Sequence, residues 1–264
     1  MGNGTFWGVD SVAYIDSSTS HGTLAHYVIN YWFASPPPHD TIVYWGRYFA
    51  IASSIANPYH SDNEAVQLIN EVKAYSGAAR GWILPLCDPP TATVQSGSGS
   101  DGNYWGNLVC QNISYWLTNG PHTHMPGNQQ IYTFLDIEST LSSAFWQGWA
   151  PAVFNYSYNG GLPYYEAAYM NPYTSGLCSF LASQTGSNTC YAIWSNQPEN
   201  ASNKCYSPGP GWGPSSCGSS PWLTTWQYSE AQNCPGAMVD LDQTNPNITG
   251  PFGFGFLDWM IYCA

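Results

Sequence analysis

Short apolar runs recur along the chain, and each of them ends in a polar residue before a longer mixed segment begins. Runs of this length between turn residues are typical of strands that are buried in a sheet. The pattern predicts eight strands, at residues 6–11, 41–49, 81–87, 130–138, 164–170, 190–195, 223–228 and 237–242.

Helical patterns separate the earlier strands. The segment 62–75 has two candidate capping residues at its beginning, Ser61 and Asp62. It carries apolar side chains at helical spacing. Further helices are predicted at residues 103–117, 143–156 and 174–182. Strands that alternate with helices indicate βαβ units and a parallel sheet. Eight such strands in 264 residues favour closure into a barrel over an open sheet.

The pattern changes after the sixth strand. Residues 197–220 are rich in Pro, Gly, Ser and Cys and have no helical period, so loops are expected to join the last strands. The chain contains no internal repeat and no linker that would divide it. The sequence therefore predicts one domain over residues 1–264, a single (β/α)8-type TIM barrel of the α/β class that is irregular in its last three strands.

The eight cysteines are even in number, widely spread and without the spacing of zinc ligands, which favours disulfides in an oxidising compartment. Pairing between sequence neighbours would give Cys87–Cys110, Cys178–Cys190, Cys205–Cys217 and Cys234–Cys263. The alternative is a cytosolic protein with reduced core cysteines. We expect a secreted, disulfide-stabilised protein whose signal peptide is absent from this chain, because residues 1–5 have no basic or long apolar region.

Charge narrows the choice of partner. The chain has four Lys and Arg against sixteen Asp and Glu, a formal net charge of −12, so nucleic acid would be repelled. No apolar run reaches the length of a membrane span. Thirteen Trp and twenty Tyr can stack on sugar rings, although many of them must also fill the core. Five glycosylation sequons occur, at Asn3, Asn112, Asn155, Asn200 and Asn247.

Carboxylates stand where the predicted strands end. Asp10 ends the first strand, Asp136 and Glu138 end the fourth, and Asp240 and Asp242 lie on the eighth. Asp136 and Glu138 are two residues apart, so they share one face of their strand. Two close carboxylates cannot both ionise freely, and one of them is then able to act as an acid, as glycosidases require. The alternatives are a pair that binds a cation and a salt bridge at the strand end.

Several short motifs in this order resemble a known family. WGVDS, FLDIE, TWQYSE and VDLD are similar to motifs of the family 25 glycoside hydrolases, the lysozyme family, and of a related glycoside-hydrolase-like barrel domain of unknown function. VYWGRYF, which contains Arg47, resembles the second group more closely. The resemblance implies Glu138 as general acid and Asp136 as nucleophile or as the residue that orients a substrate N-acetyl group. Asp10 and Asp240 would complete an acidic floor.

The same resemblance implies a set of substrate-binding residues. Trp226 and Tyr228 would lie at the rim beneath a sugar ring, and Tyr169 would reach the acid pair. Asp242 and Arg47 are also expected at the site, although Arg47 could instead pair with a carboxylate and lower its pKa. The segment SVAYIDSS and the cysteine-rich stretch between residues 190 and 217 depart from the family pattern.

The leading expectation is a secreted glycoside hydrolase that cleaves an extracellular or cell-wall polysaccharide, with peptidoglycan as the first guess and without a cofactor. A neutral or amino-sugar polymer is also attractive because the protein is acidic. The rival is a non-catalytic carbohydrate-binding or structural protein on the same barrel. A metal-dependent hydrolase that uses the acidic cluster is a third hypothesis. His122 and His124 could also suggest a metal, but they have no further ligands nearby in the sequence, and no metal is predicted.

Overall fold

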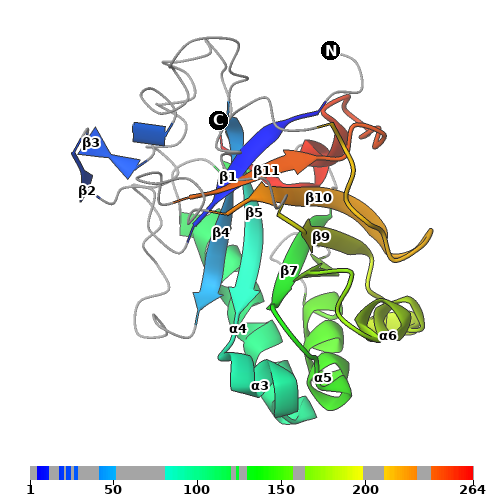
Figure 1. Cartoon of the computed structure of the whole chain (residues 1–264). Helices are drawn as coiled ribbons and strands as arrows, with labels where there is room; N and C mark the ends of the chain where they lie inside the picture. The colour runs from blue at the N-terminus through cyan, green and yellow to red at the C-terminus, as the bar shows by residue number, and fades with distance from the viewer. Residues whose placement is uncertain are drawn as a thin grey trace.

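A closed barrel of eight strands forms the centre of the protein (Figure 1). The computed structural model describes residues 5–11, 18–20, 22–24, 27–28, 42–51, 81–119, 123–124, 130–156, 164–198, 211–230 and 239–263. The barrel strands are β1 (Trp7–Asp10), β4 (Ile42–Ile51), β5 (Gly81–Asp88), β7 (Ile131–Ile137), β8 (Tyr164–Met170), β9 (Ala192–Asn196), β10 (Trp222–Ser229) and β11 (Asp240–Thr244). All eight strands coincide with predicted ones to within a few residues.

The strand order is β4-β1-β11-β10-β9-β8-β7-β5, and pairing of β4 with β5 closes the barrel. Seven strands are parallel to one another, but β11 is antiparallel to both of its neighbours, β1 and β10. The predicted (β/α)8 arrangement is therefore wrong in its last unit. The physical reason is the short connection: only residues 230–239 separate β10 from β11, fewer than a crossover to a parallel strand requires.

Helices α3 (Thr91–Ser96), α4 (Gly99–Asn119) and α5 (Ser143–Phe154) gather on one side of the barrel, and α6 (Leu177–Ala182) lies apart from them (Figure 1). The last three agree with predicted helices, α3 was not predicted, and the predicted helix at 62–75 lies outside the described residues. Among the described residues, no helix has both the length and the apolar character needed to cross a membrane.

Helices α4 and α5 cross at very close range. A Cβ atom on Gly102 would collide with the backbone of Phe145, and one on Gly148 would collide with the backbone of Gly99. Only glycine allows two helix backbones to approach so closely. The short elements complete the fold: β2 (Ser18–Thr19), β3 (Gly22–Thr23), β6 (Thr123–His124), β12 (Ile261–Cys263), η3 (Gly186–Asn188) and η5 (Gly255–Trp259).

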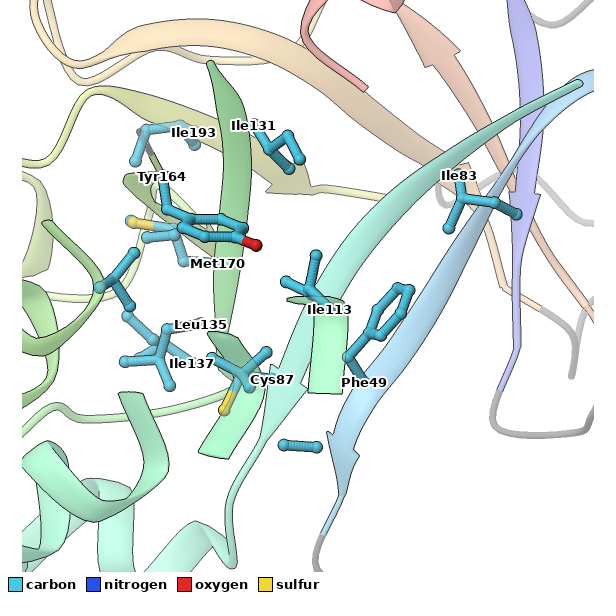
Figure 2. Packing of buried hydrophobic residues seen from close by; sticks show 14 of the residues in the cluster. Phe49, Ile83, Cys87, Ile113, Ile131, Leu135, Ile137, Tyr164, Met170 and Ile193 are labelled. Carbon is cyan, nitrogen blue, oxygen red and sulfur yellow. The ribbon is translucent and has the colours of Figure 1, made fainter. Parts of the chain in front are cut away.

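The alternation of side chains along the strands creates two cores. The outer core lies between barrel and helices, where Ile137, Tyr164 and Met170 pack near Ile113 of α4 (Figure 2). The inner core fills the barrel and includes Tyr44, Phe134, Trp194 and Phe256. Phe256 and Trp259 of η5 contact Tyr132, near the beginning of β7. The amino end of the barrel is therefore closed by η5.

One disulfide, Cys178–Cys217, is present among the described residues. It replaces two predicted pairs, Cys178–Cys190 and Cys205–Cys217, which are wrong. The predicted pair Cys87–Cys110 is also wrong, because Cys87, Cys110 and Cys190 are buried free thiols. Neighbours in sequence are not neighbours here: Cys178 lies on α6 and Cys217 precedes β10, and the fold brings them together across 39 residues. The predicted pair Cys234–Cys263 involves Cys234, which lies outside the described residues.

One of the five sequons is closed to glycosylation in the folded protein. Asn112 is buried within α4, and its side-chain amide donates to the carbonyl of Phe49 at 2.5 Å. An attached glycan would break this bond and would find no space in the outer core. The sequons that remain among the described residues are Asn155 and Asn247, and both are exposed.

Candidate active site at the carboxyl end of the barrel

Six carboxylates gather at the carboxyl end of the barrel. They come from β1 (Asp10), β5 (Asp88), β7 and the residue after it (Asp136, Glu138) and the beginning of the antiparallel β11 (Asp240, Asp242). Asp10 and Asp240 are paired across β1 and β11, and Asp136 is paired with Tyr169 across β7 and β8. In barrels with parallel strands, this end carries the chemistry.

Asp10 and Asp242 form a buried carboxylate pair. Trp194 donates a hydrogen bond from Nε1 to Oδ1 of Asp242 at 3.0 Å. Burial raises the pKa of Asp10 well above its usual range, and the charges of Asp242 and Asp240 raise it further. Burial also raises the pKa of Asp242, while its hydrogen bonds with Asp10 and Trp194 act in the opposite direction. The buried pair therefore binds a proton more tightly than an exposed carboxyl does.

A glycine makes room for this pair. Gly46 of β4 faces the barrel interior, where an added Cβ would lie 2.4 Å from the Trp194 ring and 2.7 Å from Cβ of Asp10. Both distances are shorter than carbon atoms tolerate. Any larger residue at position 46 would displace the indole that donates to Asp242, so the glycine is required by the site.

Asp88, Asp136 and Glu138 form a second group. Asp136 is 6 % exposed, and burial, followed by the charges of Asp88 and Glu138, raises its pKa well above the usual range. Burial and the charge of Glu138 raise the pKa of Asp88 to about 6. Glu138 is exposed and lies one residue beyond β7. A molecule from solution can thus reach Glu138, while Asp136 lies behind it as a neutral carboxyl.

Two tyrosines lie between the carboxylate groups. Burial raises the pKa values of Tyr48 and Tyr169, and the charges of both Asp10 and Asp136 raise them further. Tyr169 donates from its hydroxyl to Oε1 of Gln227 at 2.6 Å and accepts from Nδ2 of Asn196 at 2.9 Å. Both phenols therefore stay neutral at physiological pH, and the Tyr169 ring is held in a single position.

Arg47 lies on the outer face of β4, away from the barrel interior. Gly46 and Tyr48 face the interior, so Arg47 faces outward, where its guanidinium carbon lies 5.2 Å from the ring centre of Phe49. Among the residues that the structure describes, Arg47 is the only Lys or Arg residue. It is not among the described groups that shift the pKa values of Asp10, Asp136 and Asp242.

Trp226 and Tyr228 do not lie at the rim of the site. They are 3 % and 0 % exposed and pack in the outer core, where Tyr228 contacts the rings of Trp7 and Trp226 edge-on. Trp226 also donates from Nε1 to the carbonyl of Gln197 at 2.8 Å. The expected stacking on sugar is therefore wrong for both rings in this structure. Gln227, between them on β10, is the residue that faces the interior.

Sequence reasoning missed four residues of this site: Tyr48, Asp88, Asn196 and Gln227. Asp88 carried a usable signal, because it directly follows the predicted strand 81–87 and thus ends a barrel strand like the other acids. Gln227 could have been found from strict alternation along β10. Asn196 and Tyr48 are marked only by their hydrogen bonds and electrostatic neighbours, which sequence does not show.

The described carboxylates do not form a metal centre. Among the residues that the structure describes, no group of three or more His, Cys, Asp or Glu side chains could hold a metal ion. His124 lies on β6, which pairs with β12, and His122 is outside the described residues. Because β12 pairs with the beginning of β5, His124 lies toward the amino end of the barrel and not with the acidic side chains.

Comparison with known proteins identifies the fold. No family model matches the chain, and no curated protein matches it. A solved structure of an uncharacterized protein from B. stearothermophilus matches with a TM-score of 0.59 and 19 % identity over 97 % of this chain and 99 % of that one. The Tat-secreted protein Rv2525c of Mycobacterium tuberculosis, in complex with HEPES, gives a TM-score of 0.47 and 13 % identity over 93 % and 98 % of the two chains. The first similarity shows a shared fold.

Proposed function

We propose that the protein is a secreted glycoside hydrolase that uses the carboxylates at the carboxyl end of its barrel. The observation that carries the proposal is the convergence of six acids from four strands, one of them exposed and three of them buried with raised pKa values. Glycosidases need one carboxyl that gives a proton and further groups that support positive charge on the sugar. The motif order that resembles the family 25 glycoside hydrolases supports the same chemistry.

Glu138 is the proposed general acid because it is the exposed member of the Asp136–Glu138 pair. In the proposed reaction its proton passes to the glycosidic oxygen as the bond to the anomeric carbon breaks. The sugar that remains carries developing positive charge, and the neighbouring acids stabilise it. The C–O bond is finally replaced by a bond to a water oxygen, and the proton of that water restores Glu138.

The environment of Asp136 favours one of its two possible roles. A nucleophile must be ionised, whereas burial and two neighbouring charges keep the proton on Asp136 near neutral pH. Its Oδ1 atom has no hydrogen-bond partner among the described residues. The side chain is 6 % exposed beside Glu138, and in the proposed complex the N–H group of a substrate acetamide approaches the carboxyl from that side. We therefore assign Asp136 to orienting an N-acetyl group, which makes an N-acetylated amino-sugar polymer the preferred substrate.

Charge and redox chemistry support this setting. With a net charge of −12, the protein meets an electrostatic cost on an anionic polymer, and a neutral N-acetylated polymer avoids that cost. The disulfide Cys178–Cys217 supports an oxidising compartment, and hence secretion. A peptidoglycan-like polymer carries N-acetyl groups, and a chitin-like polymer carries N-acetyl groups and is also uncharged.

The test is release of reducing ends from a panel of polymers: peptidoglycan, chitin, and matrix polysaccharides without N-acetyl groups. We expect cleavage of an N-acetylated polymer and a decrease of at least about 10²-fold in Glu138→Gln. Asp101→Asn, which removes an exposed carboxylate on α4, is the control and should retain wild-type activity. Absence of release from every polymer, with binding intact, would replace the proposal with a non-catalytic carbohydrate-binding protein.

A further inference from the structure

A cavity lies at the end of the barrel opposite the carboxylates. It has a volume of about 630 Å³ and is bordered by Trp222, where β10 begins, by Asn245 and Asn247 after the end of β11, and by Trp259 of η5. Because β11 is antiparallel, its last residues lie at the amino end of the parallel strands. This amino-end pocket is thus separated from the acidic site by the packed inner core.

The described residues that line the amino-end pocket are aromatic, polar or apolar, and none of them is charged. Trp212, Trp222 and Trp259 contribute indole rings, and Asn247 and Thr249 contribute exposed amide and hydroxyl groups. Trp222 is 53 % exposed, which is unusual for the largest apolar side chain.

The walls of the amino-end pocket are held in place. Trp212 packs edge-on against the buried Trp226, and Trp259 stacks on Phe256 of the inner core. Cys217, within the wall segment that precedes β10, is fixed to α6 by the disulfide. A pocket whose aromatic rings are already ordered loses little conformational entropy when it binds a ligand.

A further clamp fixes the side formed by the chain after β11. The Asn245 amide donates to the carbonyl of Leu223 at 2.7 Å, and its oxygen accepts from the backbone N–H of Asn247 at 2.9 Å. Asn245 also donates from its backbone to Thr224 at 2.8 Å. These bonds join the beginning of β10 to the turn that carries Asn247, so the indole of Trp222 and the amide of Asn247 are presented on one rigid frame.

We propose that the amino-end pocket binds a neutral oligosaccharide, with a sugar ring stacked on Trp222. Among the described lining residues, an anionic ligand would find no cation and a cationic ligand no carboxylate, while a purely apolar ligand would leave the amides and hydroxyls without partners. A pyranose has an apolar face for an indole and hydroxyls for amide groups. The volume lies within the range of small-molecule sites. The inference does not depend on hydrolysis, although in a hydrolase the pocket would hold polymer outside the catalytic site.

The experiment measures binding of four neutral tetrasaccharides, chitotetraose, cellotetraose, laminaritetraose and mannotetraose, by saturation-transfer NMR and calorimetry. Glu138→Gln is the background, so that cleavage does not consume the probe. Trp222→Ala is compared with Tyr104→Ala, because Tyr104 on α4 has nearly the same exposure, 52 %. The protein is produced without N-glycosylation, since a glycan on Asn247 would occupy the same space.

We expect at least one tetrasaccharide to bind to both the Glu138→Gln protein and its Tyr104→Ala derivative. Trp222→Ala should weaken this binding by at least about tenfold, the size of a lost aromatic stack. In the Glu138-containing protein, Trp222→Ala should leave cleavage of short soluble substrates unchanged and slow cleavage of insoluble polymer. Failure of all four probes to bind, or equal binding by Trp222→Ala and Tyr104→Ala, would overturn the inference. If no protein cleaved any polymer but Trp222→Ala still weakened tetrasaccharide binding, only the proposed hydrolase would be overturned.

Discussion

Two buried carboxylic acids on adjacent strands differ in what surrounds them. Asp136 on β7 faces the interior of the barrel, and Glu166 on β8 lies on the outside, paired in register with Thr133. Burial is the first cause of a raised pKa in both. For Asp136, the charges of Asp88 and Glu138 add to that increase. For Glu166, whose pKa is raised to about 8, burial is the one cause that acts upward.

The comparison separates a functional acid from a merely buried one. Glu166 is 0 % exposed, and neither of its carboxylate oxygens has a hydrogen-bond partner among the described residues. It therefore lowers stability wherever it must ionise, and it has no path to a ligand. Asp136 belongs to a group whose member Glu138 is exposed. A raised pKa alone does not make a residue a catalytic candidate, whereas a raised pKa among other carboxylates at the barrel mouth does.

The largest effect is expected from Asp136→Leu. The change keeps most of the side-chain volume but removes the oxygen that we assign to the N–H of the N-acetyl group, so kcat/KM on the cleaved polymer should decrease by roughly 10²–10³-fold. Because Asp136 is already neutral in the folded protein, the free energy of unfolding at pH 7 should not decrease. Glu166→Gln is the matched control on the adjacent strand and should retain activity. Equal losses in both variants would remove the distinction between the two acids.

Glu166→Gln should instead change how stability depends on pH. The Glu166 carboxyl has a pKa of about 8 in the folded protein and 4.5 in the unfolded chain. Below pH 4.5 it is protonated in both states, so its ionisation does not oppose folding. Its contribution decreases as pH rises from 4.5 to 8, because ionisation then favours the unfolded chain, and it is constant above. The difference in unfolding free energy between Glu166→Gln and wild type should therefore increase by on the order of 3 kcal/mol between pH 5 and pH 8.

Guanidinium titrations at several pH values measure this difference. Thr133→Val is the control, because it removes an unpaired buried hydroxyl opposite Glu166 without removing a titratable group. Its effect on unfolding should be the same at every pH. If the difference in unfolding free energy between Glu166→Gln and wild type did not change with pH, Glu166 would have an ordinary pKa in the folded protein, and its carboxyl would be in contact with solvent.

Much of the barrel was predictable because each strand is a compact apolar run. All eight barrel strands, and the outward position of Ile137 between Asp136 and Glu138, follow from length and alternation. The direction of β11 was not predicted because the pattern of a strand is the same in both directions. It is the ten-residue connection, not the strand itself, that determines the direction.

The site was predictable where strand ends alone determine it. Asp10, Asp136 and Glu138 lie at the predicted end of the barrel. Asp240 and Asp242 were expected at the end of a parallel strand, and they lie at the same end of the barrel only because β11 is antiparallel and begins there. The aromatic residues were not predictable in the same way, because a Trp or Tyr serves a core and a ligand equally well. Trp226 and Tyr228 were expected at the site for their chemistry, yet alternation along β10 places the polar Gln227 inside.

Tyr169→Phe tests the same comparison with the smallest expected effect. Tyr169 lies three residues after Glu166 on β8 but faces inward, and its hydroxyl joins Gln227 and Asn196 beside Asp136. Loss of this hydroxyl leaves the buried Gln227 amide and the half-buried Asn196 amide short of one partner each, so we expect a cost of about 1 kcal/mol in stability. A loose Gln227 would also reduce kcat by severalfold without changing KM. Tyr165→Phe, on the inner face near the beginning of the same strand, should leave kcat unchanged, because the carboxylates lie at the other end. If both variants reduced kcat equally, the effect would come from the packing of β8, and the Tyr169 hydroxyl at the carboxyl end would have no separate role.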